Sequence, residues 1–172
     1  RWGTELFGRN AGLLAIALWC FLPEAIGNGQ MLTPDAAATA MGALFWYANW
    51  HWQQAPTWRR TLLGGVALGL AVLSKTTWLA AYPLLLLITL LWSFRATNVS
   101  RKSRWLRALA MVCISVYVLN LGYLFEGTGT RLGDFPFVST ALSGQQAKVT
   151  GNRFSDSILG KLPVPLPRNF VL

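Results

Sequence analysis

Long apolar runs separated by short polar connections dominate the first 125 residues of the sequence. Five such runs predict transmembrane helices, over residues 11–28, 34–53, 58–74, 76–94 and 105–125. Residues 126–172 combine glycines, polar side chains and a Pro-x-Pro-x-Pro run, which predicts a loop-rich segment. The pattern therefore predicts an all-α polytopic membrane protein, with a helical bundle over 1–125. It also predicts that 126–172 begins a larger outer region.

Basic residues mark the ends of the apolar runs and predict how the chain crosses the membrane. They gather before the first run, between the second and third, and between the fourth and fifth: Arg1, Arg9, Arg59, Arg60, Arg95, Arg101, Lys102, Arg104 and Arg107. If all five runs cross, these places share one side, which the positive-inside rule makes cytoplasmic. Residues 126–172 then lie on the outer face of a multi-pass protein of the plasma (inner) membrane.

The composition excludes several other classes of protein. Hydrophobic residues make up 53% of the 172 residues and charged residues only 12%, which is far from the pattern of a soluble domain. The net charge of +9 lies mostly at the ends of the apolar runs, so it indicates topology, and no nucleic-acid partner is expected. The sequence shows no nucleotide-binding loop and no His/Cys cluster, so no cofactor and no divalent metal are expected.

Both ends of the sequence suggest a piece of a longer protein. The chain begins at Arg1 without an initiator Met and ends at Leu172 with no obvious stop, just after the proline-rich run. We therefore expect a fragment, which would be inactive when isolated.

A single ammonium group interrupts a 33-residue apolar stretch that contains no other charge. Lys75 is the only charged residue between Thr61 and Ser93. A charge inside a membrane is costly and by default indicates a functional site, here one for an anion. Residues 61–74 cover only about 21 Å of a hydrocarbon core of about 30 Å. We therefore expect Lys75 to lie slightly inside the membrane, lining a cavity. Alternatively, Lys75 marks a turn and extends to the surface.

Two carboxylates share the predicted outer face with Lys75. Glu24 follows Pro23 at the end of the first apolar run, and Asp35 opens the second. A carboxylate there could hold an acceptor hydroxyl, accept its proton or orient the lysine, while the ammonium would suit a lipid-linked phosphate. Helix capping alone could also explain Asp35, and Glu24 could be an exposed loop acid.

Short motifs along nearly the whole chain resemble a known family. Three of them lie in the first part of the chain: Leu6-Phe7-Gly8-Arg9, Leu32-Thr33-Pro34-Asp35 and Ser74-Lys75. Two more follow in the second part: Tyr123-Leu124-Phe125-Glu126-Gly127 and Leu162-Pro163-Val164-Pro165-Leu166-Pro167. Their order resembles the protein O-mannosyltransferases, the aminoarabinose transferases and their bacterial relatives, which are GT-C, family 39-like glycosyltransferases. Asp35 and Lys75 carry most of the resemblance.

The resemblance implies a concrete activity. Such enzymes move a sugar from a polyprenyl-phosphate carrier to an acceptor glycan, lipid or protein on the outer face, with inversion at the anomeric carbon. It implies that Asp35 is an acid of the catalytic cavity and that Lys75 binds the donor phosphate. Glu24 is a further candidate for substrate binding from its position on the predicted outer face alone. The family's main acidic motif lies in its first outer loop, upstream of this sequence, so the general base is expected there.

Two other classes of function remain open from the sequence. Intramembrane charges also mark substrate paths in transporters and lipid flippases, although no internal repeat is visible in the five runs. A passive scaffold or assembly subunit would give the charges no chemical role. An acidic pair in the upstream loop would favour the enzyme over both.

Overall fold

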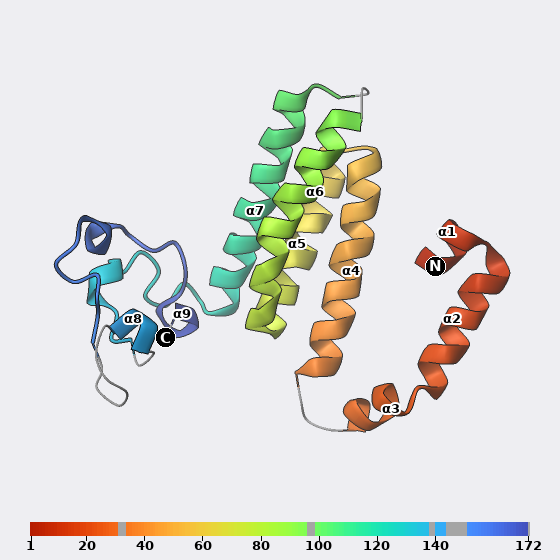
Figure 1. Cartoon of the computed structure of the whole chain (residues 1–172), viewed down its shortest axis with the longest axis horizontal. Coiled ribbons are helices and arrows are strands. Elements are labelled where there is room, and N and C mark those ends of the chain that lie inside the picture. The colour runs from red at the N-terminus through yellow and green to blue at the C-terminus, as the bar shows by residue number, and fades with distance from the viewer. Residues whose placement is uncertain (31–33, 96–98, 138–139, 144–150, 172) are drawn as a thin grey trace. The chain divides into compact units, whose positions relative to one another are not determined.

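The structure, a computed structural model, describes residues 1–30, 34–95, 99–137, 140–143 and 151–171. Its elements, drawn in Figure 1, are α1 (Trp2–Phe7), α2 (Arg9–Phe21), α3 (Pro23–Gln30), α4 (Asp35–Gln54), α5 (Trp58–Ser74), η1 (Thr76–Ala80), α6 (Ala81–Arg95), α7 (Arg101–Gly122), η2 (Leu132–Asp134), α8 (Thr140–Ser143), η3 (Ile158–Lys161) and α9 (Arg168–Val171). The chain divides into two compact units, residues 1–112 and 113–172.

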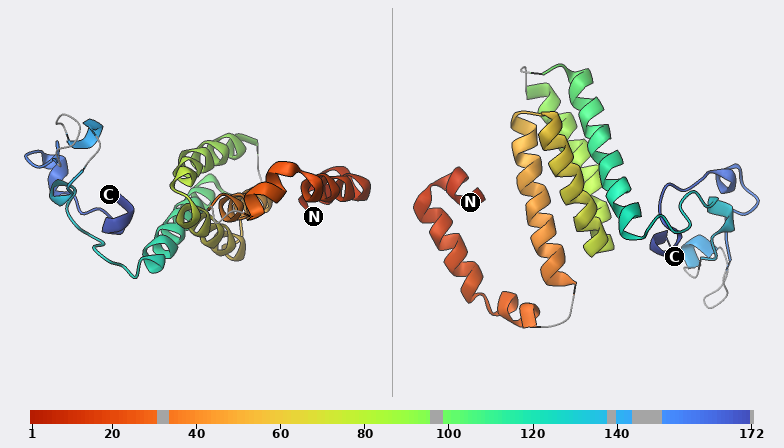
Figure 2. Two further views of the ribbon diagram at one scale, coloured as in Figure 1. Left: turned by 90° about the horizontal axis from the view of Figure 1, so that it is seen from below. Right: turned by 180° about the vertical axis from the view of Figure 1, so that it is seen from behind.

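Helices make up the first unit, as the apolar pattern predicts. One bundle contains α4, α5, α6 and the first half of α7, which lie side by side (Figures 1 and 2). Successive helices of the bundle run in opposite directions (Figure 1). In the described part of the chain, β-structure is limited to two isolated bridges, Arg131 with Pro163 and Phe137 with Gly151. The predicted all-α class is therefore confirmed.

Local chemistry sets both ends of α5, which covers the same residues as the predicted third span. The Thr57 hydroxyl accepts a hydrogen bond from the Arg60 amide and caps the first turn. The helix stops at Lys75, whose backbone is extended. Glycines on one face allow close packing, since Gly65 and Gly69 are buried and the Met111 side chain of α7 fills the space over Gly64.

The first predicted span, residues 11–28, is wrong as a single helix. Helix α2 ends at Phe21, and Leu22 adopts an extended backbone (φ −71°, ψ 117°) before α3 begins at Pro23. A proline disfavours helical geometry in the residue before it and provides no amide hydrogen, so the helix breaks there. The short helix α1 lacks a long apolar run and was not predicted.

Among the described residues, two helical segments are long and apolar enough to cross a bilayer. They are Thr76–Arg95, with a mean hydropathy of 1.7, and Arg101–Gly122, with 1.6. Only 22% and 28% of these windows are buried inside the protein, so they do not resemble the core helices of a soluble domain. Helices α2 and α5 are shorter, with 13 and 17 residues, and five crossings remain a prediction.

Arginines assigned to topology in the sequence also bind the carbonyl end of α4. Arg60 donates to the His51 and Ala55 carbonyl oxygens at 2.7 and 3.2 Å, and Arg104 donates to the Gln53 carbonyl at 3.1 Å. Arg107 donates to the carbonyl oxygen of Pro56. The last carbonyls of a helix lack intrahelical donors and carry partial negative charge, so these guanidinium groups stabilise the α4–α5 turn.

Buried Arg104 predicts a large loss of stability on truncation. Its side chain is 1% exposed, and removing it leaves the Gln53 carbonyl without that donor and opens a cavity. We expect Arg104→Ala to destabilise the fold by about 3 kcal/mol, measured as a lower thermal midpoint in detergent. Arg101→Ala, at an exposed position on the same helix, is the control and should change stability by less than about 0.5 kcal/mol. Equal midpoints for the two variants would contradict this role.

Six tryptophans of the sequence predict an aromatic belt at the inner membrane interface: Trp46, Trp50, Trp52, Trp58, Trp92 and Trp105. The prediction is wrong for Trp52. This side chain is fully buried, and its indole N–H donates to the Thr61 hydroxyl at 2.9 Å. Indole rings of a belt face the lipid headgroups. Trp52 instead packs the interior of the α4–α5 pair, because a polar partner within the bundle satisfies its donor.

A polar cluster links α1 to α4. The Glu5 carboxylate accepts from the Tyr47 hydroxyl at 2.9 Å and lies 3.0 Å from His51 Nε2. Donation from Tyr47, aided by Arg1 and His51, lowers the pKa of Glu5 against the opposing effect of desolvation. His51 therefore has a structural partner in Glu5.

The second unit is held by loops rather than by long helices. Asn152 donates to the carbonyl oxygens of Leu132 and Phe135 at 2.6 and 2.9 Å, and the buried rings of Phe135 and Phe137 stack 5.9 Å apart. The Val164 amide donates to Thr130, which sets part of the proline-rich run along an earlier loop. Residues 126–172 therefore fold as ordered loops in their described parts.

Candidate functional site

Asp35 and Lys75 form an ion pair, although 40 positions separate them in the sequence. Asp35 is the first residue of α4, and Lys75 is the extended residue between α5 and η1. The Lys75 ammonium donates to Asp35 Oδ1. The two side chains are 41% and 44% exposed, so the pair lies at an accessible edge of the bundle. An ammonium has three N–H donors, so Lys75 has donor capacity beyond the bond that Asp35 accepts.

A pocket of about 460 Å³ adjoins this pair and contains both predicted carboxylates. It is lined by Trp19 and Leu22 from the end of α2, Glu24 and Ala25 from α3, and Asp35, Ala36, Thr39 and Ala40 from α4. The break before Pro23 turns the chain so that Glu24 lies across the pocket from the start of α4. The pocket thus combines two carboxylates, a hydroxyl and an indole ring, which are groups that recognise polyhydroxylated ligands.

Trp78 fixes the position of the Lys75 turn. Its indole N–H donates to the Ala38 carbonyl oxygen at 3.0 Å, and the ring lies over Gly42 so closely that a Cβ there would overlap it. The Trp78 amide donates to the Lys75 carbonyl at 3.1 Å, within the same tight turn. This indole therefore holds the backbone of Lys75 against the first two turns of α4, beside Asp35.

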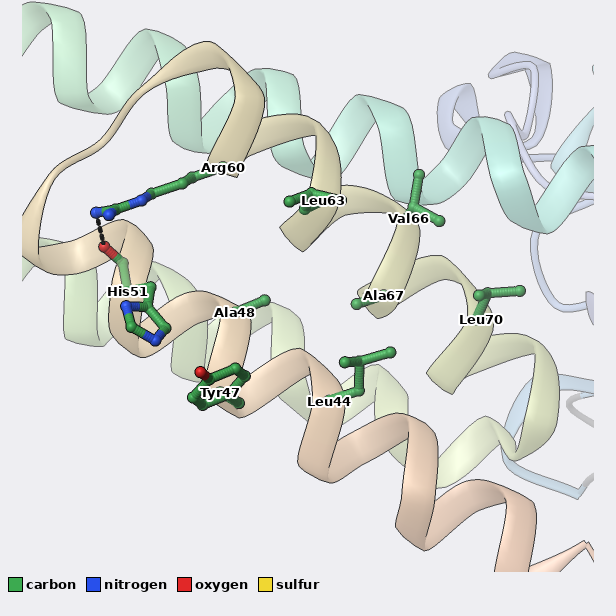
Figure 3. A pocket seen from close by; sticks show the side chains of 9 residues that line it. All are labelled: Leu44, Tyr47, Ala48, His51, Arg60, Leu63, Val66, Ala67 and Leu70. Carbon is green, nitrogen blue, oxygen red and sulfur yellow. Dashed lines mark hydrogen bonds between the residues drawn. The ribbon is translucent and has the colours of Figure 1, made fainter. Parts of the chain in front are cut away.

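A second concavity, of about 340 Å³, lies between α4 and α5 and contains none of the predicted site residues (Figure 3). Most of its lining is aliphatic. The Arg60 guanidinium approaches its end near His51, where it binds the His51 carbonyl oxygen, and the His51 ring contacts Glu5. The Arg60 and His51 side chains are thus already bound to groups of the protein. The polar side chains that suit the predicted substrate are therefore those of the pocket that contains Glu24 and Asp35.

A protein-family model described as dolichyl-phosphate-mannose-protein mannosyltransferase matches residues 2–121. The chain belongs to this family. No curated protein and no solved structure gives a match. The dolichyl-phosphate-mannose-protein mannosyltransferase family comprises membrane glycosyltransferases of the GT-C type, in agreement with the resemblance that the sequence motifs indicate.

The family match includes all three predicted site residues. Glu24, Asp35 and Lys75 lie within residues 2–121. Glu24 and Asp35 line one pocket, whereas Lys75 forms an ion pair with Asp35 but does not line that pocket. Leu32 and Thr33 of the sequence motif lie outside the described residues. In the part of the chain that is described, no three His, Cys, Asp or Glu side chains gather as a metal site would require.

Sequence reasoning missed three residues of this region: Trp19, Thr39 and Trp78. Trp19 and Thr39 line the pocket, and Trp78 anchors the lysine turn. The sequence contains one signal for Trp78, namely Gly42 within an Ala-rich helix, because a glycine inside a helix often marks a close approach. No comparable signal distinguishes Trp19 from the other tryptophans of the chain.

Proposed function

We propose that this chain is part of a multi-pass glycosyltransferase of the inner membrane that moves a sugar from a polyprenyl-phosphate carrier to an acceptor on the outer face. The observation that carries the proposal is the Asp35–Lys75 ion pair, whose carboxylate lines a pocket together with Glu24. The family match supports a membrane glycosyltransferase. The carrier-linked sugar is a substrate, so the proposal needs no separate cofactor.

Lys75 acts on the donor in this proposal. An acceptor hydroxyl attacks the anomeric carbon from the face opposite the phosphate, the bond between carbon and phosphate oxygen breaks, and the electron pair leaves with the polyprenyl phosphate. The acceptor proton passes to a base that we place outside these residues. Because negative charge grows on the leaving phosphate, a fixed ammonium stabilises the transition state more than the ground state.

The pocket accepts the sugar ring in the same proposal. The carboxylates of Asp35 and Glu24 accept hydrogen bonds from sugar hydroxyls, and the Trp19 indole offers an apolar face to the ring. Thr39 already donates its hydroxyl hydrogen to the Asp35 carbonyl at 2.8 Å, so its oxygen remains available as an acceptor. The acceptor can be a glycan, a lipid or a protein.

The assay for this function uses the complete reading frame in proteoliposomes with radiolabelled polyprenyl-phosphate mannose. We expect sugar to appear on an added acceptor, with inversion of the anomeric configuration and release of polyprenyl phosphate. Movement of the labelled lipid between leaflets without sugar transfer would instead support a transporter or flippase and overturn the proposal.

Asp35 supplies a quantitative test of the pocket. An ion pair this exposed contributes at most about 1 kcal/mol, which corresponds to about a five-fold effect. A hydrogen bond between a carboxylate and a sugar hydroxyl adds about 1.5 kcal/mol or more. Together these contributions reach about 2.5 kcal/mol, so we expect Asp35→Asn to lower kcat/KM by about 10- to 70-fold, and Asp35→Glu to retain more activity. A loss smaller than five-fold for Asp35→Asn would restrict Asp35 to positioning Lys75.

Glu24 provides the matched comparison within the same pocket. It is exposed and forms no ion pair within the described residues. We therefore expect Glu24→Gln to lower kcat/KM by only a few-fold, mainly through the KM for the donor. An effect larger than that of Asp35→Asn would reverse the roles of the two carboxylates.

A further inference from the structure

A separate groove lies on the outside of α6 and α7, the two elements that include the best membrane-spanning candidates. It has a volume of about 490 Å³ and is lined by Leu86 of α6 and by Lys102, Trp105, Leu106, Leu109 and Val112 of α7. None of these residues contributes to the pocket at Asp35. The groove is therefore distinct from the pocket at Asp35.

The shape and chemistry of the groove change along its length. Lys102 and Trp105 lie in the first turns of α7, and the remaining lining is aliphatic. The rise from Lys102 to Val112 is about 15 Å, which is half of a hydrocarbon core of about 30 Å. The groove thus matches the depth of one leaflet, with the ammonium and the indole at the level where lipid headgroups lie.

The charge of Lys102 lacks an internal counter-charge. The sequence contains no Asp or Glu between residues 36 and 125, and Lys102 forms no ion pair within the described residues. Two further exposed cations, Arg95 and Arg101, lie at the same end of the helix pair, where the Arg101 guanidinium lies 5.3 Å from the centre of the Phe94 ring. The head of the groove is therefore cationic and accessible.

We propose that this groove binds an anionic phospholipid, with its phosphate at Lys102 and one acyl chain along Leu106, Leu109 and Val112. The ammonium suits a phosphodiester as a point charge, and the aliphatic floor suits a saturated chain of one leaflet. The concavity of Figure 3 differs because Arg60 and His51 already contact groups of the protein. The inference requires that α6 and α7 lie in a membrane, but not that the protein transfers sugar.

The test measures which phospholipid the protein retains. The full-length protein is reconstituted in bilayers of equal parts phosphatidylcholine and phosphatidylglycerol, extracted in mild detergent and analysed by native mass spectrometry. We expect phosphatidylglycerol to be retained several-fold over phosphatidylcholine. Lys102→Gln should reduce the ratio nearly to one, whereas Lys102→Arg should preserve it.

Two further variants distinguish lipid binding in the groove from attraction by diffuse charge. Arg59→Gln removes an exposed cation that does not line the groove and should leave the lipid ratio unchanged. Leu109→Trp fills the aliphatic floor and should lower total retained lipid while Lys102 is intact. An unchanged ratio in Lys102→Gln, or an equal loss in Arg59→Gln, would overturn the proposal, because either result means that only diffuse charge attracts the lipid.

Discussion

Replacing Lys75 by alanine should reduce sugar transfer by about 100- to 1,000-fold. The expected size follows from the loss of one fixed charge that stabilises a developing anion. Because Lys75 is half-exposed between two helical elements, its removal should not prevent folding or membrane insertion. Transfer is measured in proteoliposomes with polyprenyl-phosphate mannose, and insertion is measured by protease accessibility of the same preparation.

Two variants make the Lys75 result specific. Lys75→Arg keeps the charge but replaces a compact ammonium with a planar group, so we expect partial activity. Thr77→Ala, at an exposed position two residues away, should behave as wild type. Full transfer activity in Lys75→Ala would remove the residue from the mechanism, and the ion pair with Asp35 would then be structural only.

Placing a leucine at position 42 should reduce transfer by about 100-fold without changing any group that contacts substrate. The ring of Trp78 occupies the space over Gly42, so a larger side chain must displace the indole and the Lys75 turn attached to it. A misplacement of about 1 Å can cost about 100-fold in rate, and overpacking costs about 1–3 kcal/mol of stability. Both transfer rate and thermal midpoint are measured for Gly42→Leu.

A neighbouring alanine and a second-site change control for the helix itself. Ala43 is exposed on the same turn of α4, so Ala43→Leu should retain both activity and stability. Adding Trp78→Ala to Gly42→Leu removes the clash and should restore the thermal midpoint more than the transfer rate. If Gly42→Leu matches wild type in both measurements, Trp78 does not position Lys75.

The sequence predicted the helix ends best where charge and hydrophobicity change together. Helix α5 covers 58–74 because Arg59 and Arg60 lie at one end and Lys75 at the other, so the local signals agree. The first span failed because the apolar run continues through Pro23, while a proline disfavours a helical backbone in the residue before it, here Leu22. The hydrophobicity of the run does not reveal the backbone restriction that one proline imposes.

The candidate site was only partly accessible to sequence reasoning. Asp35 and Lys75 follow from their position on successive helix connections of one side, and the structure brings them into contact. The contact between the Trp78 ring and Gly42 depends on how η1 packs against α4. The spacing of residues along the sequence does not predict this packing. The same applies to Arg104, whose buried carbonyl partner is 51 positions away.

The accessibility of the Asp35–Lys75 pair has a consequence for turnover. Since such a pair is worth about 1 kcal/mol or less, an arriving phosphate can exchange with the carboxylate as the counter-ion of the ammonium at small cost. After transfer, Asp35 can recapture the ammonium and so favour dissociation of the spent carrier. A fully buried pair would resist both exchanges, so the half-open position of Lys75 suits an enzyme that must bind and release a charged lipid in every cycle.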